Sequence, residues 1–194
     1  NDNQIQVSEA LQVSYLNVSY FFGDGSYIST MDGIQYFTNL KTLLCNSHSI
    51  VTLDLTALNN LEVLSCSANN ITTLNVSGLS HLRRLSCGQN SISSLNLTAA
   101  MGTLETLSIP TNHFTTLNLD GFTALKYLDC HNNQTTSFSF VGCGNIREMN
   151  CSEGRFASLD LTQVPLLEVF GAGNMLNLQS SIDVSNHIYL RQFE

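Results

Sequence analysis

Basic residues are scarce in this chain of 194 residues: it has seven Lys plus Arg against fifteen Asp plus Glu, for a formal net charge of −8. A surface that binds nucleic acid or an anionic membrane needs clustered positive charge, so the composition argues against both partners. No apolar run is long enough to cross a bilayer. The chain begins at Asn1 with neither Met nor an apolar leader, which indicates a mature or trimmed product.

Charged residues of either sign are also few, at 11% of the chain, whereas 43% is hydrophobic. The solvent-facing positions are therefore filled mainly by Ser, Thr, Asn and Gln. Few Lys, Glu and Ala remain to build helices, whereas hydroxyl and β-branched residues pack well on a pleated surface. The composition thus favours a protein built mostly from β-structure.

A short repeat dominates what is present, with the pattern L-x-x-L-x-C-x-x-N-x-[IL]-x-x-L-[DN]-[LV]-[ST]. Its eight starts are Leu40, Leu61, Leu82, Leu104, Leu125, Ile146, Leu167 and Leu190, at intervals of 21, 21, 22, 21, 21, 21 and 23 residues. A nearly constant period this short predicts a solenoid, in which similar coils stack on one another. We expect one continuous domain, with residues 1–39 as a cap containing degenerate half-repeats and residues 40–194 as the solenoid.

Each repeat contains two stretches of alternating polarity. The first, as in Leu64–Cys66, has the period of two that is typical of a half-buried strand. One such strand per coil predicts a parallel sheet whose apolar side faces the inside of the coil. The second stretch, as in Leu74–Ser77, predicts short extended segments on the opposite, convex wall, because no apolar period of 3.6 indicates a helix there.

The sixth and ninth positions of the repeat form two further columns. The sixth holds Cys45, Cys66, Cys87, Cys130 and Cys151, and the ninth holds Asn69, Asn90, Asn112 and Asn133, with His48 and Gly154 as exceptions. Ile109 and Ala172 replace cysteine in two coils, so these thiols should be buried and reduced. Zinc is the rival interpretation, but no C-x-x-C pair or accompanying His supports it. Cys143, outside the column, is the one candidate for an exposed, reactive thiol. The Asn column should form a structural ladder, because an amide both donates and accepts.

These residues resemble leucine-rich repeats, and the 21-residue form with L-[DN]-[LV]-[ST] in its second half is similar to the class called IRREKO. The lead-in Gly33–Leu43, followed by Leu-x-Cys coils, resembles surface and secreted repeat proteins of Bacteroidetes, distantly akin to internalins. The resemblance implies an α/β-type solenoid that is mostly β, a right-handed coil with a parallel concave sheet. It also implies a non-catalytic binding module of an exported or cell-surface bacterial protein that interacts with a host, with a protein or glycan as ligand.

The third and fifth positions should face outward on the concave side, and their chemistry is most mixed in the fifth and sixth repeats. The predicted ligand-binding residues are Tyr127, Asp129, Glu148 and Asn150, flanked by Arg84 and His131. An aromatic face supplies contact area while fixed polar groups give orientation, as protein or sugar recognition requires. An ordinary solvated sheet face would also explain these residues.

Two other functions use the same features. Asp129 and Glu148 could act as the carboxylate pair of a glycoside hydrolase, but a shallow face excludes water poorly, so we expect no catalysis, no cofactor and no metal. The last coil, which starts at Leu190, could instead serve edge-to-edge self-association or a structural spacer. The second position alternates in charge over most of its length, which predicts ion pairs between coils with a structural role. These residues are Lys41, Glu62, Arg83, Glu105, Lys126, Arg147, Glu168 and Arg191.

The N-terminal segment departs from the repeat. Asn1–Glu9 resembles the second half of an EF-hand calcium loop, with Asp2 and Glu9 at ligand positions, although a helical cap is the interpretation we favour. Leu16–Ser19 resembles a degenerate half-repeat, and we expect Tyr20–Tyr27 to pack as an aromatic loop over the first coil.

Overall fold

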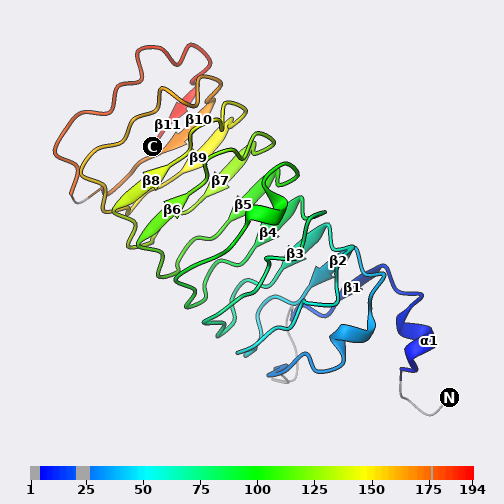
Figure 1. The fold of residues 1–194 in the computed structure, drawn as a ribbon. Coiled ribbons are helices and arrows are strands. Elements are labelled where there is room, and N and C mark those ends of the chain that lie inside the picture. Colours follow the sequence, from blue (N-terminus) through cyan, green and yellow to red (C-terminus); the bar gives the residue numbers. More distant parts are fainter. Residues whose placement is uncertain (1–4, 21–26, 176) are drawn as a thin grey trace.

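The computed structural model describes residues 5–20, 27–175 and 177–194, and it is a stack of coils with residues 5–20 at one end and residues 177–194 at the other (Figure 1). Asp2, part of the resemblance to a calcium loop, lies outside the described residues. The cap is a single helical turn, α1 (Val7–Ala10), in which the Glu9 carboxylate accepts the backbone N–H of Gln6 at 2.8 Å. The Tyr20–Tyr27 loop is described only at its two ends, where the rings of Tyr20 and Tyr27 lie 4.9 Å apart.

One wall of the stack is a nine-stranded parallel sheet, which confirms the predicted architecture (Figure 1). Every repeat start is followed two residues later by a strand, and neighbouring strands align equivalent positions, because each coil returns the chain to the same place. The strands are β1 (Tyr15–Asn17), β2 (Thr42–Leu44), β3 (Val63–Ser65), β4 (Arg84–Ser86), β5 (Thr106–Ser108), β7 (Tyr127–Asp129), β9 (Glu148–Asn150), β10 (Val169–Gly171) and β11 (Gln192–Phe193).

Strand β1 carries the sheet into the cap. Leu16 is paired with Leu43 of β2, and the backbone N–H of Val18 donates to the carbonyl of Leu44 at 2.8 Å. The half-repeat at Leu16–Ser19 is therefore the strand half of a coil, and the cap and the repeats share one sheet.

The convex wall is less regular. Only β6 (Thr116–Asn118) and β8 (Ser137–Ser139) pair there, in a two-stranded parallel sheet. The other described coils cross this wall as extended chain or in short 3-10 turns, which are η1 (Ile34–Tyr36) near the cap and η2 (Thr98–Ala100) in the third coil. Within the described residues, no helix is long and apolar enough to cross a membrane.

The Asn column forms the predicted ladder through the core. Asn112 is representative: its Oδ1 accepts the N–H of Ile92 at 2.9 Å, and its Nδ2 donates to the carbonyl of Cys87 at 3.0 Å. The same side chain lies within 3.3 Å of two carbonyls of its own coil, those of Ile109 and Pro110. Each ladder amide thus closes the turn of its own coil and ties it to the coil before.

All six cysteines are buried free thiols, as predicted for the column of five. The prediction that Cys143 is exposed and reactive was wrong. Its side chain is fully buried, its Sγ lies 2.9 Å from the carbonyl oxygen of Leu119, and burial raises its pKa to about 11. Cys143 occupies another apolar column of the repeat, the one that holds Leu79, Phe122 and Val164 in other coils.

A column of left-handed residues precedes the ladder and was not predicted. Its members are Ser47, Ala68, Gln89, Thr111, Asn132, Glu153 and Asn174, with φ between 51° and 62°. An L-residue other than glycine pays roughly 1 kcal/mol for this conformation. The hydrogen bonds of the next residue in the chain, usually the ladder Asn, hold the turn against that cost.

Candidate functional site

Strands β7 and β9 bring five of the six predicted site residues together. Tyr127 is paired with Glu148, and Asp129 is paired with Asn150. The four residues therefore lie on adjacent strands, and such strands are about 4.8 Å apart. The chain leaves β7 through Cys130 and places His131 beside Asp129. We call Tyr127, Asp129, His131, Glu148 and Asn150 the concave patch.

Arg84, the sixth predicted residue, does not join this patch. It lies on β4, and β5 separates β4 from β7, so two strand spacings, roughly 10 Å, lie between Arg84 and Tyr127. Thr106 of β5 occupies the position between them. Arg84 is exposed and makes no ion pair among the described residues.

Asp129 and His131 are joined by a hydrogen bond that the sequence did not predict. His131 Nδ1 lies 2.7 Å from Asp129 Oδ1, and the backbone N–H of His131 donates to the same oxygen at 3.3 Å. Asp129 is only 8% exposed, so it forms the buried base of the patch and does not lie on its surface as we had expected. With Nδ1–H donated to the carboxylate, the neutral ring keeps Nε2 as a hydrogen-bond acceptor. Asp129 therefore fixes the orientation of His131.

Tyr127 and Glu148 form the exposed half of the patch. The Tyr127 side chain is 36% exposed, and its pKa is raised above the ordinary value by burial and by the carboxylates of Asp129 and Glu148. The phenol consequently remains protonated at physiological pH. Glu148 is exposed and has no ion-pair partner among the described residues, so its carboxylate is free for an external group.

Asn150 lies at one side of the patch, where a glycine on the next strand leaves room for its side chain. Its Oδ1 accepts the backbone N–H of Ser152 at 3.1 Å, and its Nδ2 lies 3.4 Å from His131 Nδ1. A Cβ at Gly171, the paired position on β10, would lie 2.7 Å from Asn150 Oδ1. Gly171 therefore leaves the space that the Asn150 amide occupies.

Most Lys and Arg side chains form ion pairs along the row of residues that directly precede the strands of the sheet. Lys41 pairs with Glu62, Arg83 and Lys126 both pair with Glu105, and Arg147 and Arg191 both pair with Glu168. These contacts confirm the predicted ion pairs between coils. The cations lower the pKa of all three glutamates. Five of the seven Lys and Arg residues are used in this way, and the concave patch contains Asp129 and Glu148 but no Lys or Arg.

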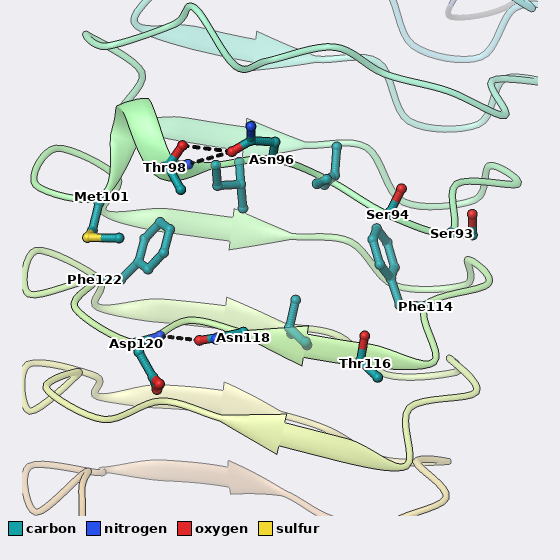
Figure 2. A pocket seen from close by; sticks show the side chains of 13 residues that line it. Ser93, Ser94, Asn96, Thr98, Met101, Phe114, Thr116, Asn118, Asp120 and Phe122 are labelled. Carbon is teal, nitrogen blue, oxygen red and sulfur yellow. Dashed lines mark hydrogen bonds between the residues drawn. The ribbon is translucent and has the colours of Figure 1, made fainter.

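A cavity on the convex wall was missed by sequence reasoning. It measures about 460 Å³ and lies between the third coil, at Ser93–Thr98, and β6 of the fourth coil (Figure 2). The signals were the 22-residue interval between Leu82 and Leu104 and the large Phe114 and Phe122 of the fourth coil. Among the described residues, no group of three His, Cys, Asp or Glu side chains could hold a metal ion.

Comparison with solved structures identifies the fold. The functional domain of InlJ from Listeria monocytogenes, which includes a cysteine ladder, matches with a TM-score of 0.70 and 21% identity, over 95% of this chain and 49% of that one. Internalin C2 from the same organism matches with a TM-score of 0.77 and 22% identity, over 97% of this chain and 82% of that one. The leucine-rich repeat domain of APL1B matches with a TM-score of 0.67 and 14% identity, over 93% of this chain and 62% of that one.

These likenesses show that the chain has a leucine-rich-repeat fold, as its sequence predicted. The chain spans about half the length of the InlJ structure. Its sequence matches no protein-family model and no curated protein.

Proposed function

We propose that this domain is a non-catalytic binding module that recognises a protein partner through the concave patch, in an exported or surface-attached bacterial protein. The single observation that carries the proposal is the in-register arrangement of Tyr127 and Glu148 on β7 and β9, next to a histidine oriented by a buried carboxylate. The patch combines an aromatic face, a free carboxylate and an oriented acceptor on rigid strands.

The chemistry of the patch favours a cationic side chain of the partner. An Arg or Lys can stack on the Tyr127 ring, pair with Glu148 and donate to His131 Nε2. No Lys or Arg belongs to the patch, and the chain carries a net charge of −8, so a basic partner is also attracted at long range.

The test uses two small probes on the ¹⁵N-labelled domain. Acetyl-Gly-Arg-Gly-amide should shift the amide signals of Tyr127, His131 and Glu148, whereas acetyl-Gly-Glu-Gly-amide should shift none. The double variant Tyr127→Ala, Glu148→Gln should lose the response, and Thr106→Ala, one strand away, should keep it. Equal responses to both peptides, or a response that survives the double variant, would refute the site.

A glycan ligand and an exported location are tested separately. Binding of neutral oligosaccharides on an array, abolished by the same double variant, would replace the protein partner with a glycan. Protease treatment of intact cells that produce the protein should degrade it if it is at the surface, and full protection together with absence from the medium would contradict export.

Self-association is the second candidate, favoured by exposed apolar side chains at and just before the last coil. Ile188 is 81% exposed, Tyr189 53% and Phe193 56%. Sedimentation velocity across a concentration range should then show a shift from monomer to dimer that Phe193→Ser removes. A sedimentation coefficient that is independent of concentration would exclude this candidate.

A further inference from the structure

We propose that the convex cavity is a second binding site, which takes an extended segment of a partner polypeptide as an additional parallel or antiparallel strand on β6. The site lies on the wall opposite the concave patch, and it does not depend on the function proposed for that patch. The argument rests on an unpaired strand edge, a cavity lined in part by apolar side chains, and one carboxylate oxygen that has no partner among the described residues.

Strand β6 has one paired and one unpaired edge. The backbone N–H of Leu119 donates to Ser139 at 2.7 Å and the carbonyl of Thr115 accepts from Thr136 at 2.9 Å, so the odd-numbered residues of this segment face β8. Because backbone groups alternate along a strand, the N–H and C=O groups of Thr116 and Asn118 face the third coil. Within the part of the chain that the structure describes, no hydrogen bond joins β6 to the Ser93–Leu97 segment.

The third coil lies beside this edge, and it is one residue longer than the coils on either side of it. The extra residue of the 22-residue interval is accommodated by η2, and the Ser93–Thr98 segment runs alongside β6 with the cavity between them (Figure 2). Leu95, which lines the cavity, is half-buried, whereas its equivalent in the preceding coil, Leu74, is only 3% exposed. The space between the two coils is therefore not filled by the protein's own side chains.

The floor and the rim of the cavity suit alternating side chains. Phe114 lies at one end of the cavity, and Met101 and Phe122 lie at the other (Figure 2). Leu95 and Leu117 also line it. Asn118 stands on the rim: its Oδ1 accepts the N–H of Asp120 at 2.9 Å, and its Nδ2 makes no hydrogen bond to the described residues. A strand laid on β6 would direct every second side chain onto this apolar floor, as in other cases of strand addition.

The charge of the cavity narrows the partner further. Among the described residues that line it, Asp120 is the only charged one. Its Oδ1 accepts hydrogen bonds from the Ser139 hydroxyl at 2.6 Å and from the N–H of Val141 at 2.8 Å. Its other carboxylate oxygen has no partner among the described residues. The complementary segment is thus apolar at alternate positions and carries a basic side chain near Asp120. A volume of about 460 Å³ lies within the range of roughly 300–1,000 Å³ that ligand sites occupy.

The probe for this site is the peptide acetyl-Val-Lys-Val-Lys-Val-amide, titrated into the ¹⁵N-labelled domain. We expect the Thr116 and Asn118 amide signals to move downfield, as new hydrogen bonds require, with a dissociation constant on the order of 1 mM for so short a peptide. The acidic counterpart, acetyl-Val-Glu-Val-Glu-Val-amide, should cause no shift.

Four variants separate this site from any other. Ser94→Trp fills the cavity from its rim and should weaken binding at least tenfold, whereas Thr73→Trp, the equivalent position one coil earlier, should leave it unchanged. Thr116→Pro removes one N–H from the unpaired edge only and should also abolish the Asn118 shift. The variant Tyr127→Ala, Glu148→Gln should bind this peptide normally. Shifts confined to the concave face, or binding that Ser94→Trp does not weaken, would overturn the proposal.

Discussion

Removal of a single ladder amide should destabilise the whole domain, and Asn112→Ala is the clearest case. Asn112 is 5% exposed, and its Oδ1 is the acceptor for the N–H of Ile92, a fully buried residue. After truncation this N–H has no partner and no access to water. An unsatisfied buried donor costs about 1–3 kcal/mol.

The energetic cost is smaller at the three carbonyls that accept hydrogen bonds from Asn112 Nδ2, because each keeps another donor. Cys87 retains the amide of Asn90 at 3.1 Å, Ile109 that of Asn133 at 3.0 Å, and Pro110 the backbone N–H of Gln89 at 2.9 Å. Adding a modest loss for these bonds, we expect the free energy of unfolding to fall by about 2–4 kcal/mol. For a chain of this length, that corresponds to a melting temperature lower by about 5–15 °C.

Urea denaturation of wild type and variant gives the free energy, and hydrogen exchange of the Ile92 amide gives the local effect. Gln134→Ala is the control, since this exposed amide makes no hydrogen bond among the described residues and its loss should cost less than about 0.5 kcal/mol. A loss below 1 kcal/mol for Asn112→Ala, or an Ile92 amide that stays as protected as in wild type, would refute the reasoning.

Three further predictions concern strain, thiols and surface charge. Thr111→Asn should stabilise the fold by about 0.5–1 kcal/mol, because Asn tolerates the φ of 53° better than a β-branched residue does; a lower urea midpoint would contradict this. Burial raises the pKa of Cys45 and Cys87 from 9.0 to about 12, so their contribution to stability is complete below pH 9 and is lost as the pH rises through 12. The urea midpoint should fall above pH 9, and Ellman's reagent at pH 8 should label these thiols only after unfolding; rapid labelling of the native protein would show the burial to be wrong. Glu105→Gln removes the partner of Arg83 and Lys126 and should lower the melting temperature at low salt, with the difference gone in about 1 M NaCl; a difference that persists in salt would mean that Glu105 acts by packing.

The sequence was sufficient to predict the sheet and the ladder, because both depend on side chains that recur at fixed positions. A leucine or asparagine that returns every 21 residues meets its equivalents in the stack, so its environment follows from the period alone. The ion pairs of Glu105 and Glu168 follow for the same reason, since they join the same position of adjacent coils.

Features that depend on one coil, or on the backbone, were not predictable in this way. Cys143 was assessed as an exception to the cysteine column, although it belongs to a column of mixed apolar residues. The left-handed residues share a backbone conformation and no side-chain type, since Ala68 and Glu153 both adopt it. The cavity lies beside the third coil, whose 22-residue length departs from the period, so the period alone does not describe it.

The candidate site was predicted in part. Positions three and five of adjacent repeats do meet, so Tyr127, Glu148 and Asn150 lie together. Arg84 lies two strands away, because residues chosen for their chemistry in different repeats need not be neighbours. The bond between Asp129 and His131 spans only two residues, but it depends on the chain turning out of β7, which the pattern of polarity does not describe.

The self-closing coil has a consequence for how such a chain can change its length. Since each ladder amide closes the turn of its own coil and binds only the coil before, a segment of 21 residues is a unit of backbone geometry with matching ends. Removing Leu125–Asn145 would bring Ile146 to the place of Leu125 and would delete Tyr127, Asp129 and His131 in one step. Recognition surfaces on this scaffold can therefore be gained, lost or moved in whole segments, while the remaining chain keeps its geometry.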